Sequence, residues 1–244
     1  MGFTGFVVSD WNGIGQVSGC TPDNCAQAIN AGIDMVMVPE DWRTLLDNMV
    51  AQVRSGVISE DRIDEAVRRI LTVKYESGLM ERGLPSERAE PFVETIGSEA
   101  HRELAREAVR RSLVLLKNDS GILPLDPAGR YRLAGSGADD IGLQSGGWTI
   151  SWQGTGNVNE DFPGGTSILD GFIRRAQTAG GDVALYDANE AGPAPDAVIM
   201  VMAENPYAEG QGDIETLAWQ QGHSRDLATI KSLKDQGIPV ITVF

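Results

Sequence analysis

The sequence predicts an α/β fold with mainly parallel sheets, and two observations support this prediction. Short apolar runs, such as residues 6–8 and 196–203, are apolar on both faces, as expected of buried parallel strands. Longer stretches with apolar residues at helical spacing follow these runs. This alternation of strands and helices is typical of parallel α/β units.

The first 78 residues contain two strand–helix units. One helix is expected to begin with Thr21 as its N-cap and Pro22 in its first position, and Ser59 is expected to cap a later helix. Two strands cannot close a barrel, so we expect residues 1–78 to be the last part of a larger domain. The expected elements are strands at 6–8 and 33–38 and helices at 25–30, 42–54 and 60–73.

Residues 79–94 have no clear periodicity and contain glycines and prolines, which indicates a linker. Residues 95–244 predict a second α/β domain with a mainly parallel sheet. Because the chain begins at a central strand and ends inside another, we expect a fragment truncated at both ends. The expected elements are a helix capped by Ser98 with Leu104 and Val109 inside, an extended segment or strand at 112–118, strands at 131–135, 182–186, 196–203 and 239–244, and helices at 166–180 and 223–237.

The composition excludes some functions. The 244 residues carry a formal net charge of −15, which would repel phosphate backbones and argues against a nucleic-acid partner. A neutral substrate is compatible with this charge. No stretch approaches the roughly 18 apolar residues of a membrane span, and no signal peptide is visible.

The sequence favours neither a metal nor a cofactor. Zinc needs about four ligands, and the two histidines are far in sequence from Cys20 and Cys25. These cysteines form either a local disulfide of an exported protein or two free thiols. The glycine-rich segment at 135–142 resembles a dinucleotide fingerprint, but Asp140 displaces its third glycine and we expect no helix to open there.

Three segments could carry chemistry. Asp10 ends a strand beside Trp11, where α/β barrels keep catalytic groups. Trp148 and Trp152 lie in a polar, glycine-flanked stretch, where indoles serve as platforms for sugars or pack a domain interface. The acids at 204–213 could serve catalysis, calcium binding or loop structure, and we favour loop structure.

The chain resembles glycoside hydrolase family 3, in particular its bacterial and plant β-glucosidase and exo-β-glucanase branch. The resemblance covers essentially the whole chain. It includes Gly-Phe-Val-Val-Ser-Asp-Trp at 5–11 and Gly-Gly-Trp-Thr-Ile-Ser-Trp-Gln-Gly at 146–154. Further motifs occur in the family's order at 31–39, 62–71, 112–118 and 206–213.

The resemblance implies the C-terminal part of a (β/α)8-like barrel at 1–78, a linker at 79–94 and an incomplete α/β/α sandwich at 95–244. It implies a retaining β-glucosidase acting on terminal non-reducing β-D-glucosyl residues, with Asp10 as the nucleophile. Trp11, Met37 and Trp152 match substrate-binding positions, and no cofactor is implied. The acid/base glutamate of this branch lies beyond Phe244, so we expect the fragment itself to be inactive.

Three alternatives remain. The parent could be a β-N-acetylglucosaminidase or a β-xylosidase of the same family, or the chain could be a non-catalytic carbohydrate-binding protein. A β-glucoside or β-glucan substrate is the one partner that the resemblance implies. Family habit and the cysteine pair favour the periplasm or the outside of the cell.

Overall fold

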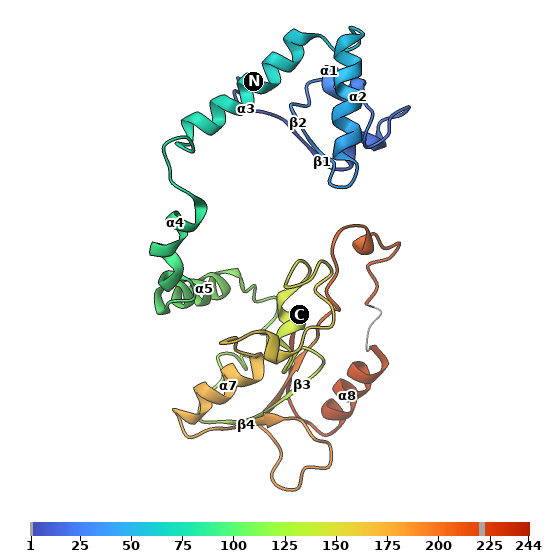
Figure 1. Cartoon of the computed structure of the whole chain (residues 1–244). Coiled ribbons are helices and arrows are strands. Elements are labelled where there is room, and N and C mark those ends of the chain that lie inside the picture. The colour runs from blue at the N-terminus through green and yellow to red at the C-terminus, as the bar shows by residue number, and fades with distance from the viewer. Residues whose placement is uncertain (1, 220–222) are drawn as a thin grey trace. The chain divides into compact units, whose positions relative to one another are not determined.

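The computed structural model describes residues 2–219 and 223–244, and the chain divides into two compact units, Met1–Val114 and Leu115–Phe244 (Figure 1). Each unit contains a parallel sheet with helices, which confirms the predicted α/β class. In the described part of the chain, no helix is long and apolar enough to cross a membrane.

The first unit is built on two short parallel strands and the helices that follow them. The predicted strand at 6–8 is wrong by two residues, because the pairing with the next strand begins at Val8 and Met35. Val8 is 42% exposed, so this run is not buried on both faces. The elements are β1 (Val8–Trp11), the 3-10 turn η1 (Gly13–Gln16), α1 (Ala26–Asn30), β2 (Met35–Met37), α2 (Trp42–Arg54) and α3 (Glu60–Glu76).

Two of the three predicted helix caps are confirmed. Ser59 caps α3 and Ser98 caps the helix that begins at residue 99, and each hydroxyl accepts a hydrogen bond from the backbone N–H three residues later. The predicted cap at Thr21 is wrong. Its hydroxyl donates to Asp23 instead, and Cys25 is the residue that precedes α1.

A small apolar core joins η1, α1 and α2. Cys20 and Cys25 form a disulfide that is part of this core, which decides between the bridge and two free thiols. The bridge closes the loop between η1 and α1. The buried members of the core are Ile14, Cys25, Ala28, Val38 and Leu45.

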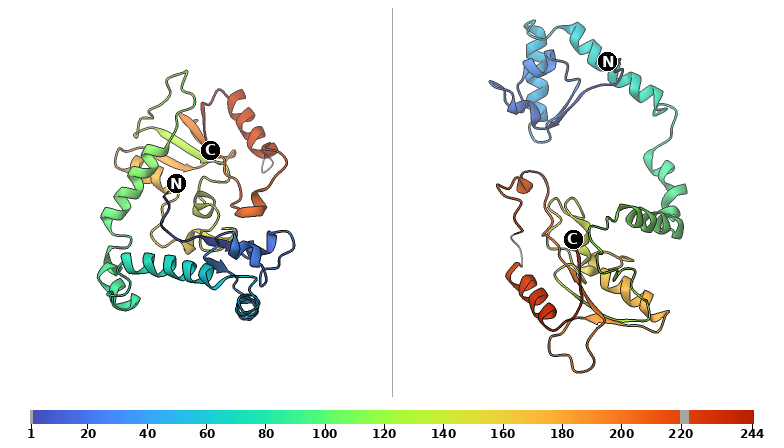
Figure 2. Two further views of the ribbon diagram at one scale, coloured as in Figure 1. Left: turned by 90° about the horizontal axis from the view of Figure 1, so that it is seen from above. Right: turned by 180° about the vertical axis from the view of Figure 1, so that it is seen from behind.

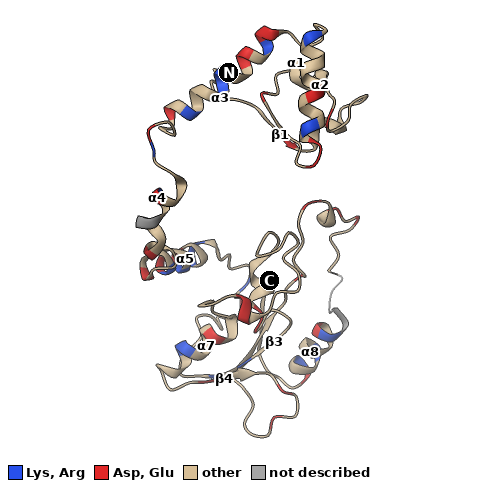
Figure 3. Cartoon of the chain, in the orientation of Figure 1, with Lys and Arg blue, Asp and Glu red and all other residues tan. Residues whose placement is uncertain are grey.

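The segment after α3 contains α4 (Pro85–Ala89), the 3-10 turn η2 (Glu90–Thr95) and α5 (Glu99–Ser112). All of α5 is described, and none of its residues is buried; Leu104, which was expected inside, is 69% exposed. Acidic and basic residues both lie along α5 (Figure 3). Their side chains pair three and four residues apart. The compact units divide at residues 114 and 115, downstream of the predicted domain start at 95. The scheme of 1–78, 79–94 and 95–244 remains a proposal.

The second unit is a parallel sheet with helices on both faces. Its strand order is β4-β3-β5-β6, and every pair is parallel, as predicted. The longer helices α7 and α8 cover opposite faces (Figures 1 and 2). The elements are β3 (Arg130–Ala134), α6 (Ile141–Ser145), the 3-10 turn η3 (Asn159–Asp161), α7 (Ile168–Gln177), β4 (Asp182–Leu185), β5 (Ala197–Val201), the 3-10 turn η4 (Glu209–Gly212), α8 (His223–Asp235) and β6 (Val240–Val243).

The two faces of β3 have different partners. Leu133 is fully buried and packs with Leu169 of α7 in the core. Arg132 alternates with it along the strand, so its side chain points to the other face. There it is only 3% exposed and pairs with Asp182 and Glu190.

Candidate active site

Asp10 lies at the carboxyl end of β1 with its side chain exposed to solvent. The strand runs through Asp10 to Trp11, one residue beyond the end expected at Asp10. One carboxylate oxygen, Oδ1, accepts a hydrogen bond from the Trp11 backbone N–H at 2.6 Å. A carboxylate has about four acceptor sites, so Asp10 can hold this local bond and still meet a ligand.

Met37 is the partner of Trp11 in the pairing of β1 with β2. The two side chains are 38% and 58% exposed. The backbone N–H of Asn12 donates to the Met37 carbonyl at 2.8 Å, which ties the two strand ends together. The structure therefore brings three of the four predicted site residues, Asp10, Trp11 and Met37, to one end of this sheet.

Ser9 connects the backbones at this end. Its hydroxyl donates to the Asp10 carbonyl and accepts from the Met37 N–H, each at 2.9 Å. The residue is only 8% exposed. The backbone of Asp10 is thus held by a buried hydroxyl while its side chain reaches solvent.

Asn12 and Gly13 shape the turn that follows Asp10. Asn12 has a left-handed φ of 52°, which asparagine tolerates better than most residues. A Cβ on Gly13 would lie 3.1 Å from the Cβ of Asp10, closer than ordinary van der Waals contact. We did not predict either role from the sequence, although the Asn-Gly pair is a turn signal that could have indicated them.

A buried ion pair aligns β1, β2 and α3. The Asp34 carboxylate accepts hydrogen bonds from the Val7 N–H at 2.9 Å and from the Arg62 guanidinium at 2.6 Å. Arg62 also donates to the carbonyls of Ile29 and Ile33. Burial raises the pKa of Asp34, but the Val7 N–H and the Arg62 guanidinium outweigh it and hold the pKa below its ordinary value of 3.8.

The fourth predicted residue, Trp152, belongs to the second unit. It lies in a loop at 146–154 that we name the tryptophan loop. The ring centroids of Trp148 and Trp152 are 6.3 Å apart, and the side chains are 68% and 55% exposed. The backbone N–H of Trp148 donates a hydrogen bond to the backbone carbonyl of Trp152 at 2.9 Å, which closes the loop.

The tryptophan loop packs against the segment at 206–213. The side chain of Gln153 accepts a hydrogen bond from the Ala208 N–H at 2.7 Å. A Cβ on Gly147 would lie 2.1 Å from the Tyr207 carbonyl oxygen, so only glycine fits there. Among residues 2–219 and 223–244, no three acidic, histidine or cysteine side chains gather in a metal-binding group.

The glycine-rich segment at 135–142 differs from the prediction in one respect. The short helix α6 does open there, because the Asp140 carboxylate accepts a hydrogen bond from the Leu143 N–H at 2.9 Å and caps it. The helix has five residues.

Parallel strands that end in an exposed acid beside a tryptophan define an α/β protein with a candidate ligand site at its strand ends. The chain belongs to glycosyl hydrolase family 3. The N-terminal domain of this family matches residues 1–73, and its C-terminal domain matches residues 113–244. These matches confirm the resemblance seen in the sequence.

Several relatives are similar over almost all of this chain. The lysosomal beta glucosidase of Dictyostelium discoideum is 34% identical over 99% of the chain and 32% of the relative. The crystal structure of an exo-1,3/1,4-beta-glucanase from a Pseudoalteromonas species is 48% identical with a TM-score of 0.92, over 100% of this chain and 30% of that one. A beta-xylosidase of Formosa agariphila is 28% identical over 100% of the chain and 36% of the relative. The chain thus spans about a third of the length of these relatives.

Proposed function

We propose that the full-length protein that carries this sequence is a retaining β-glucosidase, which releases terminal β-D-glucosyl residues from the non-reducing ends of oligosaccharides or glucans. The observation that carries the proposal is the exposed Asp10 carboxylate at the carboxyl end of β1, beside Trp11 and Met37. The relatives named as a beta glucosidase and an exo-beta-glucanase support the substrate class.

In this proposal Asp10 is the nucleophile. Its carboxylate attacks the anomeric carbon and forms a glycosyl ester, while a second acid protonates the departing oxygen and then activates water. Trp11, Met37 and Trp152 bind the substrate, because apolar side chains can cover the C–H faces of a sugar. We assign no acid/base within residues 1–244, and we expect the 244-residue chain alone to be inactive.

The test is the substitution Asp10→Asn in the full-length protein, assayed with an aryl β-glucoside. We expect kcat to fall roughly 10,000-fold, as for loss of a central catalytic group. The matched control is Asp64→Asn, which neutralises an exposed acid of α3 and should leave kcat unchanged. Unchanged activity in Asp10→Asn would contradict the assignment.

The product anomer tests the stereochemistry. A retaining enzyme releases the β-anomer first, and NMR of the early product would detect it. Release of the α-anomer would indicate an inverting mechanism and contradict the glycosyl ester.

A β-xylosidase is the second candidate, because the Formosa agariphila relative is similar over the whole chain. The two activities differ in the sugar that the site accepts. The ratio of kcat/KM for aryl β-glucoside and aryl β-xyloside distinguishes them, and we expect the glucoside to be preferred. A protein that binds these sugars without turnover would instead be a carbohydrate-binding protein.

A further inference from the structure

We infer that the loop closed by the disulfide of Cys20 and Cys25 is a positioning element for Asp10, and that this bond sets how fast the proposed nucleophile reacts. The inference rests on the proposed function of Asp10. It is carried by a chain of contacts that runs from α2 through this loop to η1 and the end of β1.

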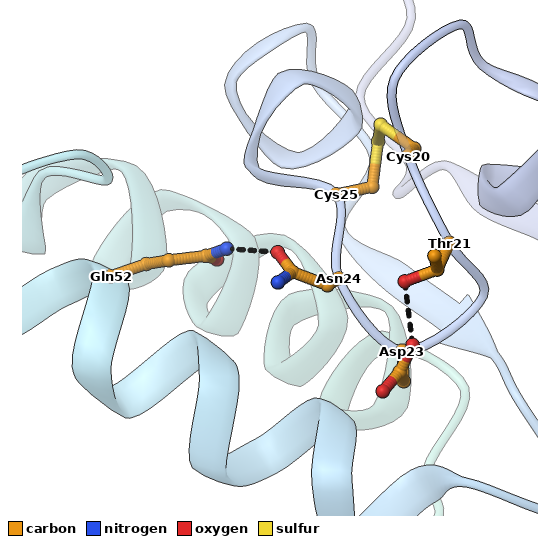
Figure 4. Close-up of a disulfide and its surroundings, with 6 residues drawn as sticks. All are labelled: Cys20, Thr21, Asp23, Asn24, Cys25 and Gln52. Carbon is orange, nitrogen blue, oxygen red and sulfur yellow. Dashed lines mark hydrogen bonds between the residues drawn. A yellow bond between two sulfur atoms is a disulfide. The ribbon is translucent and has the colours of Figure 1, made fainter.

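The loop at 20–25 is closed twice. The disulfide joins its two ends, and inside it Thr21 and Asn24 exchange two backbone hydrogen bonds of 3.1 Å each. The Thr21 hydroxyl also donates to the Asp23 carboxylate at 2.6 Å (Figure 4). The loop therefore has few ways to change its shape while the disulfide is intact.

The helix α2 anchors this loop from one side. The side-chain amide of Gln52 donates to the Asn24 side chain at 2.7 Å (Figure 4). One turn earlier, Asn48 donates to the Asp23 carbonyl at 2.9 Å. Asn48 and Gln52 lie on the same face of a 13-residue helix, so these two hydrogen bonds hold the loop against α2.

On its other side the loop meets η1. A Cβ on Gly15 would lie 2.8 Å from Cδ and 2.9 Å from the backbone nitrogen of Pro22, so the two backbones touch without room for a side chain. Ile14 is 3% exposed and shares its core with both cysteines. Movement of the loop would therefore move η1.

From η1 the contacts lead directly to Asp10. The Gly15 N–H donates to the Asn12 carbonyl at 3.0 Å, and the Asn12 N–H is bound to the Met37 carbonyl. A Cβ on Gly13 would lie 3.1 Å from the Asp10 Cβ, so the backbone of the turn passes close to Asp10. A misplacement of about 1 Å can cost up to 100-fold in rate, so a small shift of η1 would be measurable.

A disulfide that only stabilises the fold would have a different effect. Its loss would lower the melting temperature but leave the reaction rate of the folded enzyme unchanged. The rate of covalent labelling of Asp10, measured well below the melting temperature, separates these two roles.

The experiment uses the full-length protein and a 2-deoxy-2-fluoro β-glucoside with a good leaving group, which traps the glycosyl ester. We would measure the labelling rate constant and the dissociation constant of the inactivator separately, and identify the labelled residue by peptide mass spectrometry. The samples are the oxidised protein, the protein reduced with dithiothreitol, the double variant Cys20→Ser/Cys25→Ser, and Pro22→Ala, which keeps the disulfide but removes the ring against Gly15. The control Ile58→Val removes a buried methyl group that is not in the core of Ile14 and the cysteines, and it leaves the backbone hydrogen bond from Ile58 to the Gln52 carbonyl in place.

We expect labelling of Asp10 to slow about tenfold in the reduced protein and in the double variant, with an unchanged dissociation constant. Pro22→Ala should slow it without loss of the disulfide, reoxidation should restore the rate, and Ile58→Val should leave it unchanged. If the double variant does not fold, the reduced protein and Pro22→Ala still decide the question. If Asp10 is labelled in the reduced protein and in Pro22→Ala as fast as in the oxidised wild-type protein, the inference alone is overturned. Labelling of a different residue would overturn the proposed function of Asp10, and this inference with it.

Discussion

The Asp34 carboxylate and the Arg62 guanidinium meet at 2.6 Å, with side chains that are 2% and 11% exposed. The carboxylate also holds the Val7 N–H, just before β1, and the guanidinium holds the carbonyl of Ile33, just before β2. A residue of α3 thus fixes where both strands begin. Asp10 lies three residues beyond Val7, so its position depends on this ion pair.

Removal of Arg62 should destabilise the first unit. In Arg62→Met the buried Asp34 charge loses its partner, and we expect the free energy of unfolding to fall by about 3 kcal/mol. Urea unfolding of the full-length protein, followed by a probe in the first unit, measures this loss. The control Arg68→Met changes an exposed arginine of the same helix and should have little effect. Equal losses in the two variants would contradict the role of the ion pair.

The contribution of Asp34 to stability should depend on pH. Its pKa is lower in the folded protein than the ordinary 3.8, so the stabilisation is complete above about pH 5 and is lost as the pH falls through the lower folded pKa. The free energy of unfolding should therefore approach that of Asp34→Asn below pH 3.8. A difference between the two proteins that stays constant down to about pH 2 would show that Asp34 does not titrate in this way.

The helices were easier to predict from the sequence than the strands. The bounds of α2 and the caps of α3 and α5 follow from local signals, namely apolar spacing and a serine before the first turn. The start of β1 does not, because it depends on pairing with β2 and on the Asp34 carboxylate. The same holds for α1, where a disulfide and a backbone bridge override the capping signal of Thr21.

A side chain at position 13 should slow the reaction. In Gly13→Ala the new Cβ would press on the Asp10 Cβ at 3.1 Å, so we expect kcat to fall about tenfold. Steady-state kinetics with an aryl β-glucoside measures the change. The control Gly171→Ala adds a methyl group to α7, where nothing lies within 4 Å, and should leave kcat unchanged. A Gly13→Ala protein with normal kcat would show that Asp10 has room to adjust.

Removal of the Trp152 indole should weaken binding of longer substrates. We expect KM for a β-linked glucose disaccharide to rise about tenfold in Trp152→Ala, since one aromatic contact contributes about 1.4 kcal/mol. An aryl glucoside with a small leaving group should be affected less. The matched variant is Trp148→Ala, and an equal effect there would indicate that the indoles support the loop rather than contact the sugar.

The ion pairs of Arg132 with Asp182 and Glu190 should stabilise the second unit against unfolding. Glu190 and Asp182 raise the pKa of Arg132 further above its ordinary value, and burial opposes them. In Arg132→Met, Arg130 still pairs with both acids, whose side chains are 50% and 35% exposed, so we expect a loss of about 1 kcal/mol in the free energy of unfolding of this unit. Lys231→Met, at an exposed position of α8, is the control. A loss no larger than that of the control would contradict the prediction.

The candidate site was predictable only in part. Asp10 and Trp11 were found because an acid and an aromatic residue follow an apolar run, and Trp152 because it lies in a polar, glycine-flanked stretch. Met37 was found because the sequence resembles a known family. Gly13 was missed, since its role is the absence of a side chain next to Asp10. Such a constraint becomes visible only when the distance between the two residues is known.

Gly147 approaches the Tyr207 carbonyl so closely that any side chain there would force the two segments apart. Ala208, the residue after Tyr207, donates a hydrogen bond from its backbone N–H to the Gln153 side chain and so joins the same two segments. The tryptophan loop and residues 206–213 therefore form a single module, although more than 50 residues separate Gln153 from Ala208 in the chain. A chimera that receives the tryptophan loop from a relative would also need residues 206–213 of that relative. Substrate preference should therefore be transferred only when both segments are exchanged together.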